Sequence, residues 1–217
     1  MTATNQPEAV PHYTPGAERL LAAASELFYR DGIHAVGVDT IAAAAGVTKK
    51  TLYDQFGSKE SLAVAYLRGR DARWRDFLER GLGPVPLGSV ERILAVFDVS
   101  ARWALENSAK GCSAINARAE VGDPAHPVAA EATRQKKWMR DVFEQHCRDA
   151  TLADPERLAT TLMLLYEGAL VTTGMGTFAD PFTAGRDAAA VLLAASARPS
   201  PPLAGAGRCE NGPARGE

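Results

Sequence analysis

Four consecutive hydrogen-bond donors and a nearby lysine stand in the first third of the chain: Thr48, Lys49, Lys50, Thr51 and Lys59. Lysine ammonium groups donate hydrogen bonds to O6 and N7 of guanine in the major groove of DNA, or pair with phosphates. Thr48 also has the side chain that caps a short helix over 49–56. These residues predict a cationic helix end suited to nucleic acid. The alternative is a solvated lysine pair on a surface helix.

Cysteine and histidine chemistry has less support in the sequence. The three cysteines, Cys112, Cys147 and Cys209, show no CxxC or Cys/His spacing typical of a zinc site. We interpret them as two partly buried thiols and one in a C-terminal tail, with a redox or electrophile sensor at Cys112 as the alternative. An enzyme using Cys112, His126 or His146 is a second class of function, but no nucleophile motif or phosphate loop supports it. We therefore expect no catalytic activity, no metal and no cofactor.

Two short helices must position the donor side chains. Apolar spacing and glycine breaks predict four helices in the first 80 residues, over 17–30, 38–45, 49–56 and 58–80. Gly46 permits the tight turn between the second and third helices, and the small side chains of Ala42 and Ala45 let these helices cross closely. The arrangement is a helix-turn-helix, which projects its second helix into a major groove.

The remaining chain is predicted to be helical as well. A Gly/Pro-rich break at 81–88 precedes five more helices, over 90–105, 112–121, 128–147, 155–174 and 181–197. No stretch alternates as a β-strand does, so we predict an all-α fold, in which an N-terminal three-helix domain is joined by a fourth helix to a helical bundle. The predicted parts are a disordered arm (1–14), the helix-turn-helix domain (15–60, with the start of the fourth helix), the bundle (61–197) and a disordered tail (198–217).

Composition restricts the class of protein. The 217 residues are 46% hydrophobic and 23% charged, which are ordinary values for a globular chain. No apolar run approaches the ~20 residues that cross a bilayer, and the polar N-terminus lacks a signal-peptide pattern, so we expect a cytoplasmic protein without membrane contact. The net charge is −2, and residues 1–80 hold ten basic and ten acidic side chains. Nucleic-acid binding must therefore come from local placement of charge.

Residues 17–67 carry two longer motifs. The first is close to A-A-x-x-L-F-x-x-x-G and stands at Ala22, Ala23, Leu27, Phe28 and Gly32, with one more residue between Ala23 and Leu27 than the pattern has. The second runs without a gap through Ile41, Ala42, Ala45, Gly46, Val47, Thr48, Thr51, Leu52, Tyr53, Phe56, Ser58, Lys59, Glu60 and Leu62. Both resemble the TetR/AcrR family of transcriptional regulators. One position departs from the family, since Gly37 stands where a Ser or Thr usually caps the second helix and touches a phosphate. Thr40 is the candidate to replace that hydroxyl.

The resemblance implies a sequence-specific DNA-binding transcriptional regulator whose partner is double-stranded operator DNA. It implies these DNA-contacting residues: Thr40, Thr48, Lys49, Lys50, Thr51, Tyr53, Gln55 and Lys59. Lys49 and Lys50 would contact base edges or phosphates, and Lys59 would bind a phosphate at the start of the fourth helix. The Tyr53 hydroxyl would contact the DNA backbone. A helix-turn-helix that binds protein is the alternative, and it would show no salt-dependent DNA affinity.

The resemblance further implies a homodimer and a small-molecule effector. The helices near 157–174 and 183–197 would pair with their copies across a two-fold axis. An effector held in the ligand-binding and dimerisation domain would release a repressor from a palindromic operator. The candidate pocket residues combine apolar walls with a few polar anchors: Phe97, Trp103, Cys112, Asn116, Glu120, Trp138, Met139, Met163, Tyr166, Glu167 and Met175. Ordinary core packing is the alternative for each. A loose GC-x-x-x-N-x-x-x-E pattern at Gly111, Cys112, Asn116 and Glu120 occurs in some members.

Overall fold

The computed structural model describes residues 13–107 and 110–196. The predicted tail over 198–217, with Cys209, and nearly all of the predicted arm over 1–14 lie outside these residues. Within the described part every regular element is a helix, which confirms the all-α prediction. The helices in chain order are α1 (Pro15–Asp31), α2 (Val38–Ala44), α3 (Lys49–Phe56), α4 (Lys59–Leu82), α5 (Val90–Asn107), α6 (Ser113–Ala119), α7 (Pro127–Asp149), α8 (Pro155–Thr172) and α9 (Pro181–Ser196).

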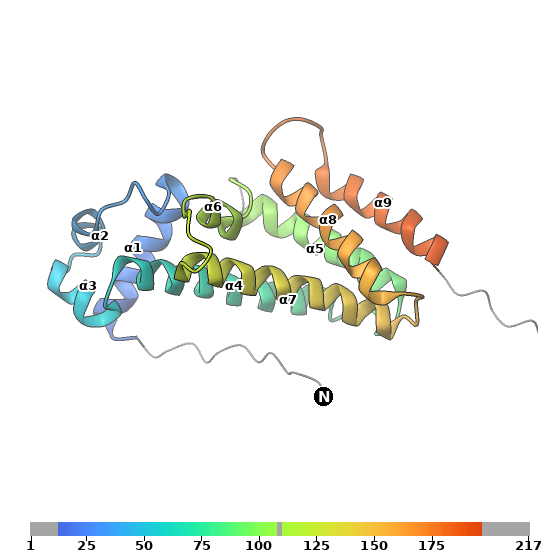
Figure 1. Ribbon diagram of the computed structural model, residues 1–217, viewed down its shortest axis with the longest axis horizontal. Coiled ribbons are helices and arrows are strands. Elements are labelled where there is room, and N and C mark those ends of the chain that lie inside the picture. Colours follow the sequence, from blue (N-terminus) through green and yellow to red (C-terminus); the bar gives the residue numbers. More distant parts are fainter. Residues whose placement is uncertain (1–12, 108–109, 197–217) are drawn as a thin grey trace, which may run out of the picture.

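The helices form two groups that α4 connects. Figure 1 shows α1, α2 and α3 at one end of an elongated molecule, while α5, α7, α8 and α9 form a bundle at the other. Helix α4 starts directly after α3 and runs beside α7 into the bundle. The short helix α6 lies where the two groups meet. A displacement of α4 or α6 would therefore reach both groups.

Local sequence signals set the ends of the helices that matter for function. The Thr48 hydroxyl accepts a hydrogen bond from the Thr51 amide at 3.2 Å and caps α3, and Ser58 caps α4 through the Ser61 amide at 3.0 Å. Such a cap stabilises a helix by about 1 kcal/mol. Gly46, with φ +61°, makes the turn between α2 and α3 in a conformation that glycine adopts without strain. The Thr48 cap and the Gly46 turn are the ones that the sequence predicts.

Two hydrophobic cores hold the groups together. The N-terminal core contains the fully buried Leu20, Ile41, Leu52 and Leu62, and it continues into α4 as far as Leu67. The bundle core is built around residues that share α5, α7, α8 and α9, including Phe97, Phe143, Leu158, Leu162 and Leu193. The N-terminal core also takes in Ala117 of α6 and Val128 of α7. The helix-turn-helix group is therefore packed against the bundle as well as being connected to it by α4.

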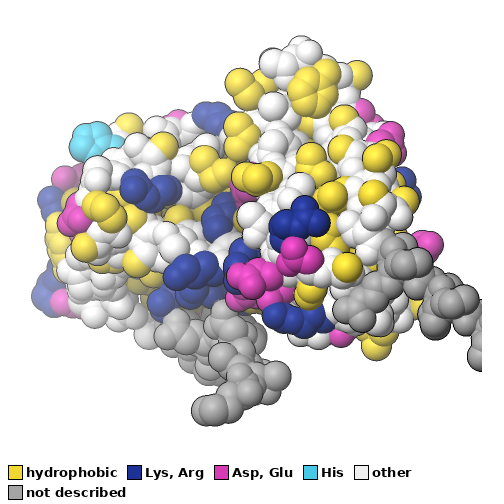
Figure 2. Space-filling model, turned by 45° about the vertical axis from the view of Figure 1, so that its right-hand side comes forward, with side chains coloured by type: hydrophobic (Ala, Val, Ile, Leu, Met, Phe, Trp, Pro, Cys, Tyr) yellow, Lys and Arg dark blue, Asp and Glu magenta, His cyan; other side chains and the backbone are white. Residues whose placement is uncertain are grey.

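One face of the bundle keeps its apolar side chains exposed. Leu164 on α8 is 70% exposed and Val191 on α9 is 73% exposed, and Val171, Met175 and Phe178 add to this apolar surface. Figure 2 shows hydrophobic side chains gathered over this part of the molecule. Exposed apolar side chains in such a group are typical of a protein–protein contact. Among the described residues, no helix has the length and apolar character needed to cross a bilayer.

Candidate functional site

Helices α2 and α3 cross closely because the residues between them are small. Ala42 and Ala45 are buried, and the Val47 amide donates to the Ala42 carbonyl at 3.0 Å across the turn. Ile41 and Leu52 fill the space beneath them and are both fully buried. Arg19 of α1 donates from Nε to the Ala45 carbonyl at 3.2 Å. The result is a helix-turn-helix whose α3 has a fixed inner face.

The outer face of α3 carries the donor side chains that the sequence singles out. Thr48, Lys49, Lys50 and Gln55 are exposed, and Tyr53 is 45% exposed although it is aromatic. Thr51 is half-buried because its amide and hydroxyl both turn toward the Thr48 cap. The packing of Leu52 inward thus leaves a row of hydroxyl, ammonium and phenol groups facing away from the protein.

Both α3 lysines are held by carboxylates. Lys49 Nζ lies 3.2 Å from Asp39 Oδ2, which comes from α2, and Lys50 Nζ lies 2.5 Å from Asp54 Oδ2, one turn along α3. All four side chains are largely exposed, so these pairs add little to stability. Asp39 and Asp54 were not predicted as site residues from the sequence, although Asp54 stands at i+4 from Lys50. The local charge is consequently close to neutral.

Lys59 begins α4 beside the helix-turn-helix. Its Nζ donates to the His34 carbonyl at 3.3 Å, which keeps the half-buried side chain against the loop between α1 and α2. The next residue, Glu60, has a lowered pKa, because its carboxylate accepts a hydrogen bond from the Glu60 backbone amide and another from the Ser58 side chain. At α2 the departure from the family pattern is visible, since Gly37 provides no side-chain cap. Thr40 is exposed on α2.

Gln55 and the chain that enters α1 lie together. The Thr14 hydroxyl donates to Gln55 Oε1 at 2.9 Å, and the Tyr13 ring lies 5.5 Å from the Phe56 ring, measured between centroids. The residues before α1 therefore contact the C-terminal half of α3. This contact holds one of the predicted DNA-contacting side chains, Gln55, against the protein.

A small cavity of about 70 Å³ opens between α4, α5, α6, α7 and α8. Five residues of the predicted pocket line it: Trp103, Cys112, Trp138, Met139 and Tyr166. The other lining residues were not predicted from the sequence: Arg70, Asp71, Trp74, Ser113, Ala114, Gln135, Lys136 and Leu170. All three tryptophans of the chain therefore line this cavity. The i, i+4 spacing of Arg70 and Trp74 on α4 was the signal available in the sequence.

A half-buried lysine contributes a charged group to the cavity wall. Lys136 Nζ lies 3.1 Å from Cys112 Sγ and 2.7 Å and 3.0 Å from the two Glu167 oxygens. Burial lowers the pKa of Lys136, but the Cys112 sulfur and the Glu167 carboxylate outweigh burial and raise it. Glu167, a predicted pocket residue, thus reaches the cavity through its ion pair. Three acceptors use the three N–H donors of one ammonium group.

Four predicted pocket residues lie elsewhere for clear physical reasons. Phe97 is fully buried, with its ring centroid 5.8 Å from that of Phe143, so it is a core residue. Met163 packs against the same core. Met175 is 63% exposed in the loop between α8 and α9 and does not line this cavity. Asn116 lines a different hollow at the end of α1, and its amide donates to the Lys110 carbonyl at 2.9 Å.

Glu120, the remaining predicted pocket residue, holds the helix-turn-helix group against α6. Its carboxylate accepts hydrogen bonds from the backbone amides of Ile33 at 3.1 Å and His34 at 2.6 Å. It lines the hollow of about 210 Å³ shared with Asn116, rather than the cavity of the tryptophans. The Tyr29 hydroxyl accepts from the Lys110 amide at 3.0 Å in the same region. Together these contacts join the end of α1 to the segment that carries α6.

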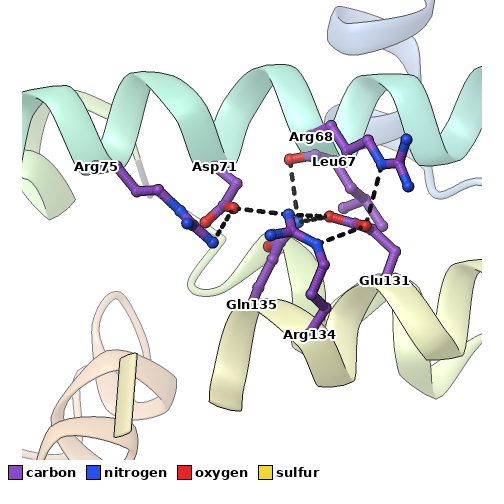
Figure 3. A network of polar contacts seen from close by, with 7 residues as sticks. All are labelled: Leu67, Arg68, Asp71, Arg75, Glu131, Arg134 and Gln135. Carbon is purple, nitrogen blue, oxygen red and sulfur yellow. Dashed lines mark hydrogen bonds and ion pairs between the residues drawn. The ribbon is translucent and has the colours of Figure 1, made fainter. Parts of the chain in front are cut away.

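A buried charge network ties α4 to α7 (Figure 3). Asp71 of α4 forms an ion pair with Arg75 at 2.8 Å and accepts a hydrogen bond from Arg134 of α7 at 2.9 Å. Arg134 also contacts Glu131 at 2.6 Å, and this glutamate is nearly fully buried. Burial raises the pKa of Glu131, but hydrogen bonds from Arg134 and Gln135 outweigh it, so the pKa is lowered overall. Arg68 of α4 donates to the same glutamate at 3.2 Å, so each buried carboxylate of the network is held by two arginines.

The residues considered for catalysis do not form one site. The His126 ring caps α7 by accepting from the Val128 amide at 3.2 Å. His146 is half-buried on the same helix, and burial, then the nearby Arg92, lower its pKa. Cys112 contacts Lys136, as described above. Among the described residues, no group of three or more His, Cys, Asp or Glu side chains is arranged to hold a metal ion.

The chain is similar to known DNA-binding regulators. Residues 20–66 match the family model described as bacterial regulatory proteins, tetR family. The crystal structure of SCO4454, a TetR-family transcriptional regulator from Streptomyces coelicolor, has 30% identity and a TM-score of 0.74, covering 82% of this chain and 96% of that one. A putative tetR-type regulator from Streptomyces avermitilis (sav143) has 34% identity and a TM-score of 0.71, with coverage of 85% and 98%.

Curated relatives match over shorter segments. The HTH-type transcriptional activator FasR of Mycolicibacterium smegmatis is 52% identical over 50 residues, which are 23% of each chain. The uncharacterized HTH-type regulator MT1294 of Mycobacterium tuberculosis is 30% identical over 106 residues, or 49% of this chain and 52% of that protein. The chain thus spans a quarter to a half of the curated relatives that it matches.

Proposed function

Because the chain belongs to the TetR family and is a DNA-binding transcriptional regulator, we propose that it acts as a homodimeric repressor released from a palindromic operator by a small molecule. The observation that carries the DNA-binding part is the outward row of Thr48, Lys49, Lys50 and Tyr53 on a capped α3. A helix of this width fits one major groove. The FasR match covers 23% of each chain, so that protein's role as an activator is not transferred to this chain.

Lys59 is proposed to bind a phosphate. Helix α4 is 24 residues long, and the amide groups of its first turn and the Lys59 ammonium lie at the same end. Helix N-termini favour anions because their backbone N–H groups and the helix dipole both point positive charge outward. Contact with a phosphate would replace the 3.3 Å hydrogen bond of Lys59 to the His34 carbonyl.

A second copy of the chain is the proposed occupant of the exposed apolar face on α8 and α9. Leu164, Val171 and Val191 project from these two helices and would become buried against their counterparts. Two-fold pairing of this kind aligns two recognition helices on one side of the DNA. They must lie about 34–36 Å apart to enter successive major grooves.

The cavity lined by the tryptophans is the proposed effector site. Its volume of about 70 Å³ is well below the roughly 300–1,000 Å³ of typical ligand pockets. Binding of a larger molecule would therefore move the surrounding helices, including α4 through Arg70, Asp71 and Trp74. By linkage, the effector weakens DNA binding only as far as it binds the DNA-incompetent form more tightly, typically by about 1–3 kcal/mol.

Gel shifts and footprinting on DNA from the region upstream of the gene test this function. We expect salt-dependent binding to a palindromic site, with protection of two half-sites about one helical turn apart. A reporter fused to that site would lose expression when the protein is present, and would gain it for an activator. Wild-type protein that binds none of these fragments would overturn the proposal.

A further inference from the structure

The ion pairs of Lys49 with Asp39 and of Lys50 with Asp54 are too exposed to matter much for folding, but they lie where DNA selectivity would be determined. Lys50 has 81% of its side chain exposed, and Asp39, the partner of Lys49, has 79% exposed. Exposed pairs of this kind contribute little to the stability of a fold. Each pair nevertheless places a carboxylate beside an ammonium group on the surface that is proposed to face DNA.

A lysine held by an aspartate interacts differently with phosphates and with bases. Non-specific affinity comes from neutralising phosphates and releasing their counterions. A Lys–Asp pair carries no net charge, so it gains little from a phosphate, which the carboxylate also repels. The ammonium has three donors, and the single carboxylate contact of Lys50, at 2.5 Å, leaves donors available for guanine O6 and N7.

The two aspartates also fix where the ammonium groups lie. Asp54 follows Lys50 by one turn on α3, and Asp39 reaches Lys49 from α2, across the turn of the motif. Each lysine is thereby drawn toward its own helix-turn-helix rather than outward along the DNA backbone. The equal numbers of basic and acidic residues over 1–80 fit a surface that binds arbitrary DNA weakly.

We propose that Asp39 and Asp54 are specificity-determining residues that act through Lys49 and Lys50, lowering affinity for DNA of any sequence more than affinity for the operator. This inference rests on the proposed function of α3 in DNA recognition. Direct acceptance of a hydrogen bond from a cytosine N4 amino group by Asp54 is a different mechanism. The experiment below distinguishes the two.

The test uses full-length Asp39→Asn and Asp54→Asn, which remove charge without changing size. An operator is first selected from a random duplex library with the wild-type protein, and a scrambled duplex of equal length and composition serves as comparison. Fluorescence anisotropy then gives Kd for both duplexes between 50 and 200 mM salt. Asp76→Asn is the matched control, because Asp76 forms an exposed i, i+4 pair with Arg80 on α4, outside α3.

We expect each substitution to strengthen binding to the scrambled duplex and to reduce the ratio of operator to scrambled affinity. Each freed lysine should steepen the plot of log affinity against log salt by about 1, which is about a 3.5-fold larger loss over a fourfold rise in salt. The control should leave the ratio and the slope unchanged. In a Lys50→Met background, Asp54→Asn should lose most of its effect on scrambled DNA, because the aspartate acts through that lysine.

Other outcomes overturn the inference. An unchanged ratio, or equal gains for both duplexes, would show that the aspartates do not determine specificity. A loss of operator binding by Asp54→Asn that depends on one G·C pair would assign Asp54 a direct base contact. Thermal unfolding of each variant checks that the fold is retained. Wild-type protein that binds neither duplex overturns the proposed function itself, which is a result separate from any change in ratio.

Discussion

The Glu120 carboxylate accepts a hydrogen bond from the backbone amide of His34, with 2.6 Å between Oε2 and the nitrogen. The same loop residue accepts from Lys59 through its carbonyl. His34 therefore lies between the end of α6, which begins at the cavity, and the start of α4, which is proposed to bind DNA. Two hydrogen bonds at this one loop residue therefore connect the helix beside the cavity with the helix that begins at the DNA-binding group.

Loss of the Glu120 carboxylate should loosen the helix-turn-helix group. We expect Glu120→Ala to reduce the free energy of unfolding by about 1 kcal/mol, because two amide donors lose a charged acceptor at an exposed site. Hydrogen exchange of the Ile33 and His34 amides should become faster while that of the bundle stays slow. Glu106→Ala, on the exposed surface of α5, is the control. Unchanged exchange at these two amides would contradict the prediction.

The lysines at the DNA-facing surface should separate into two roles. Lys59→Ala is expected to weaken binding to all DNA and to reduce the salt slope by about 1, because one phosphate contact is lost. Lys50→Ala should change which bases are preferred within the site. Competition binding against a panel of single-base variants measures both effects, with Lys137→Ala on α7 as a control. Equal weakening for every base variant with Lys50→Ala would argue against base contact.

The exposed face of α8 and α9 should control assembly. Leu164→Glu places a charge where an apolar side chain is 70% exposed in a single chain. If a second copy covers it, dimerisation should weaken by roughly 2 kcal/mol, a factor of about 30 in the dimer dissociation constant. Sedimentation equilibrium measures this constant. Leu105→Glu, at a leucine of α5 that is 88% exposed, should leave assembly unchanged, and a shift with both variants would point to general destabilisation.

The charge network between α4 and α7 should make stability depend on pH. Glu131 has a lowered pKa in the folded protein, so its contribution is present above the unfolded value of 4.5 and is lost as the pH falls through the folded pKa. Arg134→Ala removes two hydrogen bonds from the buried Glu131 carboxylate, which keeps only Arg68 and Gln135 as donors, and should cost about 2 kcal/mol at pH 7. Urea unfolding at pH 7 and near pH 4 should show the difference from wild type narrowing in acid. If the variant and the wild type differ by the same free energy of unfolding at both pH values, ionisation of Glu131 does not cause the loss of stability.

The two cysteines of the described part should differ in reactivity. Burial raises the pKa of Cys147 to about 11, so it holds little thiolate at neutral pH. Cys112 is only half-buried and lies beside an ammonium group. Iodoacetamide treatment of the native protein, followed by peptide mass spectrometry, should therefore label Cys112 and leave Cys147 unmodified. Labelling of Cys147 at the same rate would indicate that the bundle core opens readily.

Helix ends were predictable from the sequence because their determinants are local. The caps at Thr48 and Ser58 involve residues three positions away, and the helix-turn-helix motif fits within one continuous segment. The cavity depends on contacts between distant segments, such as Lys136 with Glu167 and Cys112. The apolar spacing along each predicted helix identified aromatic residues as candidates, but it did not show which helix faces pack against one another. Met175 was predicted as a lining residue, yet it stands in an exposed loop.

Glu120 is a second case in which contacts between distant segments could not be predicted from the sequence. The sequence placed it at i+4 from Asn116 within a predicted helix over 112–121, and in the structure Asn116 lies in α6 while Glu120 is the C-cap residue of that helix. Their neighbours could not be deduced, because the backbone amides of residues 33 and 34 are more than 80 positions away. A carboxylate that accepts from backbone leaves no pattern in the partner's sequence.

Trp74, Trp103 and Trp138 are the only tryptophans in the 217 residues, and all three line the same small cavity. Indole emission from this protein is therefore a local signal rather than an average over the molecule. A compound that enters the cavity should alter its intensity or wavelength, whereas events on the helix-turn-helix surface should leave it nearly unchanged. Libraries of candidate effectors can thus be screened with unlabelled protein, before any operator or target gene is known.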